Sequence, residues 1–451
     1  MQNIISLELI SATSENGFSL DELVFRTKEL FETEAMAGFV SLILQLIDER
    51  ICMNIVQGKS DNTGQSCCCN ERFEYHDRSL RQFRTSVGTV KISWRRLKCV
   101  KCGKTITPLR DFLGLAPYQS KTLELEKLVT EIVSEQSYRR SSTHLESIGS
   151  IPVPKSTAHR WVVQTDCDQI DTGTDTFSLL FADGTGFKRR PDKDKRISNR
   201  GELRVALGVT RSSSVVPLGA FSGKSWDEIS SLVKGERKNK ELVADMLVSE
   251  GETGLVKSLA KLCNDSQRSH WHLVRDLNYT MWKDDAGKLE RKQKQKELNA
   301  VIGIEIPEED FEKVCDDDKK DLQDAVNSAE SDLHKLIGKL LEKGYKIAAD
   351  YLNRSAKNMF SYARRWLETG IVTPRVSSMI ERMMRELGRR LKRIAFGWSE
   401  EGAAKMARII IKRFTSENQW EKYWHEKLRL LDNVMLALKT IKVQNPQTLG
   451  R

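Results

Sequence analysis

Residues 181–190 read FADGTGFKRR, and this stretch decides how the chain is organised. It closes an apolar run that begins at Phe177 and has the length and composition of a buried strand, so we expect Asp183 to end that strand. Gly184 and Gly186 follow closely, and residues without side chains let a metal ion or a phosphate approach the carboxylate. A turn aspartate after a strand is the plainer interpretation.

A second acid lies far along the chain, in SSMIERMMRELGRRLKRIAFGW at residues 377–398. Glu381 stands near the start of this basic segment, whose apolar spacing predicts a helix. Carboxylates from separate elements can converge on divalent cations that activate and stabilise the oxygens of a phosphodiester. The alternative for Glu381 is an ion pair with Arg385, one helical turn further on.

A third acid occupies a setting like that of Asp183. Glu250 lies in MLVSEGETG at residues 246–254, after an apolar run and directly before a glycine. It would complete a set of three carboxylates, and a loop carboxylate is the plainer alternative. Glu252 is a second candidate for the same place, whereas Asp245 comes too early in the strand.

The segments between these acids predict an α/β core. FSLLFADG, LRVALGVT and VVPLGAF predict three consecutive strands, and the run before Glu250 predicts a fourth. A further short strand is expected at residues 270–273, along which His270 and His272 would alternate. His272 and Arg275 are candidates to contact a phosphate, and packing in the core is the alternative for the histidines.

The charge of the chain favours a polyanionic partner. The sequence holds 73 Lys and Arg against 63 Asp and Glu, which gives a formal net charge of +10 and a pI near 9.0. From residue 373 to 451 there are 17 Lys or Arg against 8 Asp or Glu, so the excess is concentrated in this region. A basic region of this kind suits nucleic acid, and a solubilising surface is the alternative.

The N-terminal sequence predicts a cytoplasmic protein. MQNIISLELISATSENG has neither the basic start nor the cleavage signature of a secretory leader. The most apolar stretch, residues 36–47, is too short to cross a bilayer. We therefore expect no membrane partner.

The cysteines predict a structural zinc site. Nine cysteines are present and five of them fall within residues 67–102, which in a cytoplasmic chain favours metal ligation over disulfides. The last two have the CxxC spacing of a zinc knuckle, whereas the first three are consecutive, so unmetallated thiols are the alternative. The candidate Zn²⁺ ligands are Cys67, Cys69, Cys99 and Cys102, with His76 as a substitute.

Residues 126–163 predict two helices joined by a short turn that contains Pro152 and Pro154. This is the pattern of a helix-turn-helix, and KSTAHRWV would be its second helix. Two short helices of any origin give a similar pattern. The side chains available to phosphates and base edges would be Lys155, Ser156, Thr157, His159 and Arg160.

Changes in composition divide the chain into six regions. A polar stretch rich in Gly and Ser at residues 57–68 predicts a linker, and a block rich in Lys, Glu and Asp with a helical leucine stripe predicts a helical insertion. The regions that we expect are an N-terminal helical region (1–60), a zinc-ribbon-like β region (61–115), the helix-turn-helix (116–170), the first part of the core (171–282), the helical insertion (283–372), and the completion of the core with basic C-terminal helices (373–451).

Taken in order, these motifs resemble those of prokaryotic insertion-sequence transposases of the DDE type, in particular the groups related to Mutator-like transposases that carry a helical insertion. The resemblance covers roughly residues 65–400, and the order and spacing of the motifs carry it. The motifs are RRLKCVKCGK, STAHRWV, FADGTGFK, MLVSEGETG, HWHLVRDL and SSMIERMMRELGRRLKR.

The resemblance implies a multidomain α+β protein with a ribonuclease H-like α/β catalytic core, interrupted by an all-α insertion and preceded by the Cys-containing β ribbon and the helix-turn-helix. It implies that Asp183, Glu250 and Glu381 bind Mg²⁺ or Mn²⁺ and catalyse cleavage and strand transfer of double-stranded DNA at the terminal inverted repeats of the element. A homodimer or larger assembly associated with the nucleoid is also implied. Besides the second helix named above, the expected DNA contacts are Lys188, Arg189, His272, Arg275, Arg385, Arg389 and Arg390.

Two positions depart from the family pattern. The second acid is usually Asp, and the extra methylene of Glu250 displaces the carboxylate by roughly 1 Å, a shift that can reduce the rate on the order of a hundredfold. Ser269 stands three residues before His272, where related proteins carry Cys or Asp. The activity of this copy is therefore left open, and the alternative function is a non-catalytic DNA-binding protein derived from a transposase.

Overall fold

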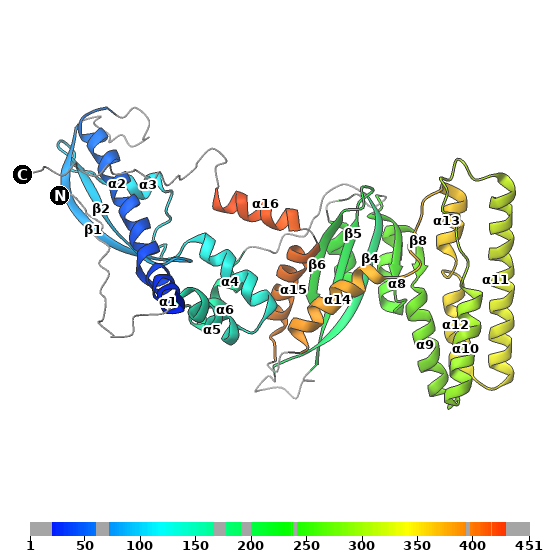
Figure 1. The fold of residues 1–451 in the computed structure, drawn as a ribbon. Coiled ribbons are helices and arrows are strands. Elements are labelled where there is room, and N and C mark those ends of the chain that lie inside the picture. The colour runs from blue at the N-terminus through cyan, green and yellow to red at the C-terminus, as the bar shows by residue number, and fades with distance from the viewer. Residues whose placement is uncertain are drawn as a thin grey trace, which may run out of the picture.

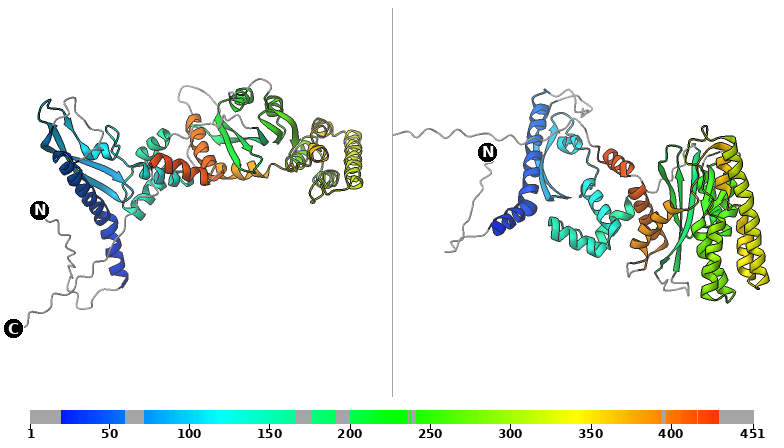
Figure 2. Two further views of the ribbon diagram at one scale, coloured as in Figure 1. Left: turned by 90° about the horizontal axis from the view of Figure 1, so that it is seen from above. Right: turned by 45° about the vertical axis from the view of Figure 1, so that its right-hand side comes forward.

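The computed structural model is an elongated α+β protein whose parts follow one another along its length (Figure 1). A long helix lies across a small sheet at one end, three short helices come next, a five-stranded sheet follows, and a block of helices forms the far end (Figures 1 and 2). The structure describes residues 20–59, 72–165, 176–190, 200–235, 237, 241–393, 397–415 and 417–429. The mixed α+β class expected from the sequence is confirmed.

The N-terminal part is a helix packed on an antiparallel sheet. Strand β2 alternates buried Val90, Ile92 and Trp94 with more exposed residues, so that one face of the sheet packs on the helix. Gly88 begins β2 at φ +104°, a conformation that favours glycine at the hairpin turn. The elements are α1 (Leu20–Leu30), the π-helix η1 (Phe31–Ala35), α2 (Met36–Val56), β1 (Phe73–Thr85), β2 (Gly88–Cys99), β3 (Thr105–Ile106) and α3 (Pro108–Phe112).

Three helices connect this sheet to the rest of the molecule: α4 (Leu123–Glu135), α5 (Tyr138–Gly149) and α6 (Lys155–Gln164). The Thr122 and Ser137 side chains cap α4 and α5 by accepting hydrogen bonds from backbone N–H groups of the first turn. Ser150 adopts a left-handed conformation at the end of α5, and the proline-containing turn leads into α6. Helices therefore lie on both sides of the proline-containing turn, as predicted, but the segment before the turn is two helices, α4 and α5, instead of one.

The central sheet has the strand order β6-β5-β4-β7-β8. Strands β4, β5 and β6 pair antiparallel, and β7 and β8 then add parallel strands beside β4. The prediction that Asp183 ends a strand is wrong: β4 continues to Lys188, because β5 pairs with it as far as Arg200. The strands are β4 (Phe177–Lys188), β5 (Arg200–Val209), β6 (Val215–Ser222), β7 (Ala244–Ser249) and β8 (Cys263–Arg268).

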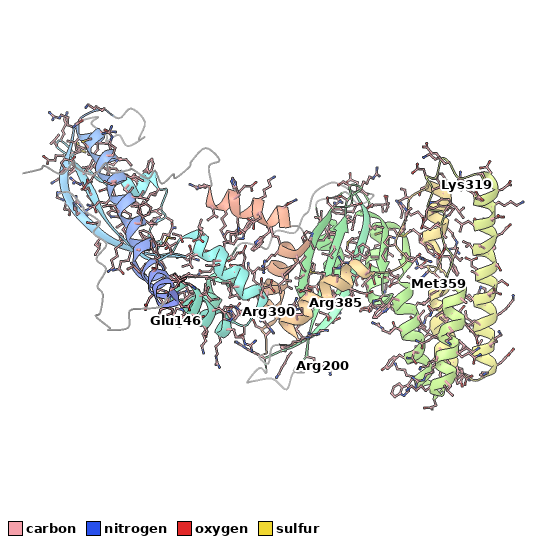
Figure 3. The ribbon with its side chains drawn as sticks, in the orientation of Figure 1. Glu146, Arg200, Lys319, Met359, Arg385 and Arg390 are labelled. Carbon is pink, nitrogen blue, oxygen red and sulfur yellow. The ribbon has the colours of Figure 1, made fainter. Side chains whose placement is uncertain are left out.

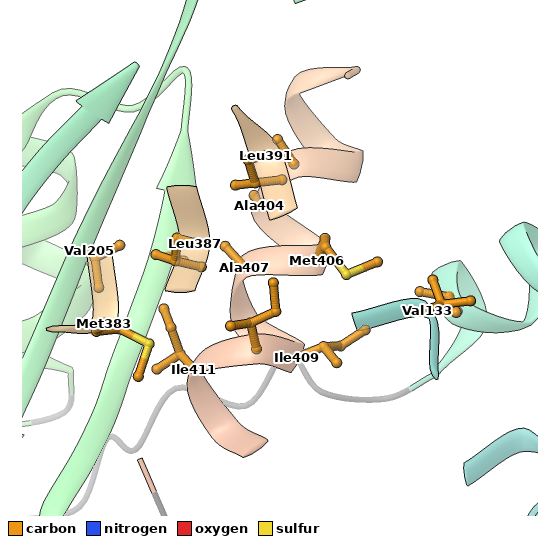
Figure 4. Close-up of a cluster of buried hydrophobic side chains, with 14 of the residues drawn as sticks. Val133, Val205, Met383, Leu387, Leu391, Ala404, Met406, Ala407, Ile409 and Ile411 are labelled. Atoms are coloured by element: carbon orange, nitrogen blue, oxygen red, sulfur yellow. The ribbon is translucent and has the colours of Figure 1, made fainter. Parts of the chain in front are cut away.

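Helices cover both faces of this sheet. Because successive side chains of a strand point to opposite faces, Leu180 packs in the cluster with α7 and α8, whereas Phe181 packs in the cluster with α14 and α15. Figure 4 shows part of the second cluster, with Met383 of α14 and Ala407 of α15. Asp183 alternates in step with Phe181 and so belongs to the α14 face. The covering elements are α7 (Trp226–Lys234), α8 (Thr253–Leu259) and the short 3₁₀ turn η2 (Ala260–Leu262) on one face, and α14 (Ser378–Leu391) and α15 (Glu400–Thr415) on the other.

A block of helices with its own buried core stands beside β8. Its first helix begins at His270, so the short strand expected at residues 270–273 is wrong; the strand of this region is β8, directly before it. The leucine stripe predicted for the block lies on α11, where Leu322, Val326 and Leu333 are buried. The helices are α9 (His270–Lys283), α10 (Lys288–Val301), α11 (Asp316–Glu342), α12 (Lys346–Ala356) and α13 (Ser361–Thr369).

The C-terminal helices fasten α4 to the central sheet. Helix α15 packs on β6, and α16 (Glu417–Leu428) packs against α4, where the Trp420 indole N–H donates to Glu131 at 2.8 Å. Buried side chains of α4, α6, α14, α15 and α16 form one cluster with the sheet. Among the described helices, none is long and apolar enough to cross a membrane.

Candidate active site

The first two acids meet because their strands run side by side. Strand β4 pairs parallel with β7 up to Ala182 and Ser249; Asp183 is the next residue of β4, and Glu250 directly follows the end of β7. Asp183 is 8% exposed, and its Oδ1 accepts a hydrogen bond from the backbone N–H of Gly184 at 2.7 Å. The Asp183 and Glu250 carboxyl groups lie close enough to change each other's pKa. The extra methylene of the glutamate therefore does not keep the two acids apart.

Burial changes the protonation of this pair. It raises the pKa of Asp183 to about 6 and the pKa of Glu250 to about 7, since desolvation disfavours the charged carboxylate. The negative charge of Asp183 raises the pKa of Glu250 further, and Glu381 acts on Asp183 in the same sense. Two desolvated carboxyl groups close together are a favourable place for a shared proton or a cation.

A chain of serine hydrogen bonds holds the third acid at the same place. The Ser377 hydroxyl donates to Glu381 Oε1 at 2.8 Å and lies 3.0 Å from the Ser269 hydroxyl. The backbone N–H of Ser269 in turn donates to the carbonyl of Ser249, at the end of β7, at 2.9 Å. These contacts join the starts of α9 and α14 to the strand that carries Glu250.

His272 stands between the two glutamates. Its Nδ1 lies 3.6 Å from Glu250 Oε2, and its Nε2 lies 3.4 Å from Glu381 Oε1. Burial lowers the pKa of His272 to about 4, and the nearby charge of Arg275 lowers it further, so the ring is neutral at neutral pH. The Arg275 Nη2 is 4.0 Å from Glu250 Oε2. His270, by contrast, is buried against the Met359 carbonyl at 2.8 Å.

The other candidate acids lie outside this cluster. Glu252 accepts a hydrogen bond from the Trp226 indole N–H at 2.9 Å. Asp245 forms an ion pair with Arg365 at 3.2 Å and so ties β7 to α13. The alternative of an ion pair between Glu381 and Arg385 does not describe the observed contacts of Glu381, whose carboxylate meets Ser377 and His272.

The chemistry of the cluster suits a hard divalent cation. Carboxylate oxygens are the ligands that Mg²⁺ prefers, and Asp183 and Glu250 already bring two carboxyl groups close together. The buried Nδ1 of His272 has no hydrogen-bond partner among the described residues. In the same part of the chain, no three His, Cys, Asp or Glu side chains converge closely enough to hold a metal ion as they stand. The residues that fit a cation are therefore the Asp183–Glu250 pair, with Glu381 and His272 beside it.

The predicted DNA-contacting residues fall in several places. Lys155, Ser156, His159 and Arg160 are exposed on α6, and Thr157 is half-buried there. Lys188 is exposed at the end of β4, and Arg189 after it is ion-paired with Glu400 at 2.6 Å. Arg385 and Arg389 are exposed on α14, and Figure 3 labels Arg385 there.

Arg390 is buried, so it is not available as the DNA contact that we expected. Its Nε donates to the Val133 carbonyl at 2.8 Å, and its guanidinium lies over the rings of Tyr138 and Trp398. It lies at the end of α14 nearest α4–α6 (Figure 3). The sequence alone does not show that Arg390 is buried and Arg389 exposed, because both belong to one run of basic residues.

The zinc candidates are described only in part. Cys99 is buried at the end of β2 and Cys102 is exposed in the turn that follows. The backbone N–H of Gly103 donates to the Cys99 carbonyl at 3.0 Å and closes this turn. Cys67 and Cys69 lie outside the described residues. His76 is exposed on β1, beside a bulge in its pairing with β2.

Two sets of residues at the site went unnoticed in the sequence. Ser249 and Ser377 carry no pattern that marks them, since serine is common in every setting. The aromatic residues Trp271, Tyr279 and Trp282 did leave a signal: once residues 270–283 are taken as a helix, their spacing places them on one face.

The part of the chain that holds the small sheet and α4–α6 matches a protein-family model. Residues 66–161 match a domain of unknown function, DUF6431. No curated protein matches the sequence. Among solved structures, the Drosophila P element transposase strand transfer complex is similar over 70% of this chain and 83% of that chain, at 12% identity and a TM-score of 0.25. That similarity is too low to carry an argument about fold or function.

Proposed function

We propose that the protein is a DNA strand-transfer enzyme of the DDE transposase type, with Asp183, Glu250 and Glu381 as its metal-binding acids. One observation carries the proposal. The parallel pairing of β4 and β7 places two acids close together, and α14 brings a third acid to the same face, within reach of His272. Acids that converge from three distant segments are costly to bury together, and a shared cation offsets that repulsion.

The strand order supports a ribonuclease H-like core. Three antiparallel strands extended by two parallel ones, with helices on both faces and the first acid on the central strand, are the arrangement expected of such a core. We propose that helices α10 to α13 are an insertion into it, so that residues 171–282, with α9, and residues 373–451 belong to one catalytic unit. The regions 61–115 and 116–170 would then be the β ribbon and the DNA-binding helices.

The proposed reaction has two steps at phosphorus. A water oxygen attacks the phosphodiester at the element end, the bond from phosphorus to the 3′ oxygen breaks, and that oxygen leaves as a 3′-hydroxyl. The hydroxyl oxygen, after loss of its proton, then attacks a phosphodiester of target DNA and displaces a second 3′ oxygen. Bound Mg²⁺ or Mn²⁺ supplies activation of the attacking oxygen and stabilisation of the leaving oxygen. The chain itself holds the acids in place, and neutral His272 separates Glu250 from Glu381.

DNA contacts are proposed for the exposed cations on both sides of the acids. Arg385 and Arg389 on α14 and Lys155 and Arg160 on α6 would hold phosphates, since cations near a duplex replace its condensed counterions. A Zn²⁺ ion bound by Cys99 and Cys102, with Cys67 and Cys69 as the other proposed ligands, would fix the β2–β3 turn. A dimer or larger assembly on paired ends is part of the proposal.

An excision assay in cells tests the proposal. A marker is flanked by the DNA that borders the gene of this chain, and wild type, Glu381→Gln or Glu250→Asp protein is supplied. We expect excision by wild type and a loss of at least a hundredfold with Glu381→Gln, because the amide removes a charged ligand without changing its shape. Glu252→Gln is the matched control, since that acid contacts Trp226 instead of the cluster.

The outcomes separate an active from an inactive copy. Excision by Glu250→Asp but not by wild type would mean that the extra methylene has disabled an otherwise intact centre. Excision that survives Glu381→Gln would contradict the assignment of this acid. No excision by any of the proteins would overturn the enzymatic proposal in favour of the second candidate.

The second candidate is a non-catalytic DNA-binding protein derived from a transposase. The observation that favours it is the position of His272, whose ring keeps Glu381 apart from Glu250, together with the lack of a ready three-residue metal site in the described part of the chain. Binding of the flanking DNA that persists in chelator, without cleavage in Mg²⁺ or Mn²⁺, would support this function.

A further inference from the structure

One face of α9 carries exposed aromatic side chains. Trp271, Tyr279 and Trp282 expose 50%, 55% and 55% of their surface. Together with Arg275 they fall on one side of the helix, because their spacing follows the helical repeat. These four residues are here called the α9 aromatic face. Large exposed apolar groups gathered on one face mark a binding surface.

The α9 aromatic face begins at the candidate active site. The Trp271 ring meets the His272 ring edge-on, with centroids 4.8 Å apart, and the Arg275 guanidinium lies 5.0 Å from the Trp271 centroid. Further along the helix, Tyr279 and Trp282 stack with their planes 22° apart and their centroids separated by 5.7 Å. A ligand lying on these rings would therefore pass directly beside the acids.

Cations flank the aromatic rings. The Lys283 ammonium lies 4.7 Å from the Tyr279 centroid. Arg291 of α10 donates to Asn278 Oδ1 at 3.0 Å and lines a shallow hollow together with Arg275, Tyr279 and Trp282. Asp276 is the acid in this hollow, and Arg275 neutralises it through a 2.7 Å ion pair.

This combination of groups matches a nucleic acid strand with unpaired bases. Aromatic rings stack on the faces of bases, and neighbouring cations hold the phosphates between them. A duplex cannot use the rings, because its bases are already stacked on each other. A purely apolar partner would leave the positive charges of Lys283 and Arg291 beside the rings without counter-charges, so a single strand fits the face better than an apolar protein surface does.

We infer that the α9 aromatic face binds unpaired nucleotides of the DNA strand that passes the acids. The inference rests on the proposed function for the identity of the strand, and it adds that the DNA is unstacked next to the scissile phosphate. Stacking of each base on such a ring typically changes affinity by about tenfold or more. The face would thus hold the strand open while the acids act on its backbone.

The test measures binding without catalysis. Full-length protein with Glu381→Gln is titrated in chelator against a fluorescent single-stranded oligonucleotide and against the same sequence as a duplex, by anisotropy. In this background, three double variants replace Tyr279 and Trp282 with Ala, with Leu or with Phe. Tyr118→Ala is the matched control, since that tyrosine is 93% exposed and lies outside α9. Thermal unfolding checks that each variant is folded.

We expect single-strand affinity to fall at least tenfold with Ala and with Leu, to be retained with Phe, and to be unchanged by Tyr118→Ala. Duplex affinity should change little in all of them. Wild-type-like binding by the Leu variant, or an equal loss for duplex and single strand, would overturn the inference. If the Leu variant binds normally and the Ala variant also changes the oligomeric state, the face docks protein instead. Because the assay needs no cleavage, its result is independent of the excision assay.

Discussion

At the scale of single residues, the three acids work against the stability of the folded chain. Asp183 is buried and Glu250 is partly buried, and desolvation disfavours ionisation of both. The charge of Asp183 acts further against ionisation of Glu250, and that of Glu381 against ionisation of Asp183. The unfolded chain ionises the same groups freely. A site that binds a cation therefore destabilises the protein when the cation is removed.

This gives a prediction for Glu250→Gln in chelator. The folded protein holds the pKa of Glu250 at about 7, above its ordinary value of 4.5, so it binds this proton more tightly than the unfolded chain does. Tighter binding of this proton by the folded state stabilises the folded protein fully below about pH 4.5. This stabilisation is lost as the pH rises through about 7, where the folded state also releases the proton. We expect the variant to be more stable than wild type by about 1–3 kcal/mol at pH 8 and equally stable at pH 4, measured by urea unfolding.

The same variants can be compared with and without added Mg²⁺. Added Mg²⁺ should raise the melting temperature of wild type at pH 8, because a ligand that binds only the folded state stabilises it. Glu250→Gln should lose most of that increase, and Glu252→Gln should keep it. A variant that is less stable than wild type at both pH values would contradict the proposed repulsion.

At the scale of elements, helix α14 both presents cations at the surface and anchors itself to α4, and two adjacent arginines divide these roles. Arg389 is exposed and pairs with Glu386 at its surface, whereas Arg390 is buried between α14 and α4. Burial lowers the pKa of Arg390 to about 10. The hydrogen bond to the Val133 carbonyl and the two rings beneath the guanidinium fix the end of α14, and with it the angle at which Glu381 enters the site.

We expect Arg390→Ala to lower the free energy of unfolding by about 1.5–3 kcal/mol, the range for a hydrogen bond that involves a charged group. Arg390→Lys should not restore it, because an ammonium cannot stack and hydrogen-bond in the same plane. Arg389→Ala should change stability by less than about 0.5 kcal/mol and instead weaken duplex binding at low salt. Chemical denaturation and a salt titration of DNA affinity measure the two effects, and equal destabilisation by both variants would argue against the division of roles.

Elements were predictable where the sequence pattern has a single interpretation. The buried stripe from Leu322 along α11 follows directly from a period of about 3.6 residues. His270–Leu273 is too short to show either period, so the start of α9 was taken for a strand. The sequence predicts that Asp183 belongs to a strand. It does not predict that the strand continues to Lys188, because this continuation depends on pairing with β5, which residues 181–190 do not reveal. The serine contacts depend on three segments at once, and no local pattern encodes them.

At the scale of the whole molecule, the helical block is fastened to the sheet along the edge of β8. Gln267 donates to the Met359 carbonyl at 3.0 Å and accepts from the Tyr362 N–H at 2.8 Å, and the Arg268 N–H donates to the Asn358 carbonyl at 2.8 Å. Residues 358–362 thus provide hydrogen-bond partners for the Arg268 backbone N–H, at the open edge of the sheet, and for the buried Gln267 side chain. Because α9 begins in the site and continues into the block, movement of the block would move His272.

The Gln267 amide gives a test of this coupling. Gln267→Ala leaves buried partners without hydrogen bonds, so we expect a loss of about 1–3 kcal/mol in the free energy of unfolding. Hydrogen exchange should increase at residues 358–362 and at the start of α9. Gln323→Ala, an exposed change on α11, is the control. Exchange that increases evenly over the whole chain would indicate general destabilisation instead of a loosened joint.

The hydrogen bonds from Ser249 through Ser269 to Ser377 have a consequence for the protein as it is made. Residue 249 leaves the ribosome long before residue 377, and Glu381 emerges later still. Throughout that interval the nascent chain carries Asp183 and Glu250 but lacks the segment that positions the last acid. Under the proposed function, a translation product that stops before residue 377 would therefore lack the third acid and be unable to cut DNA.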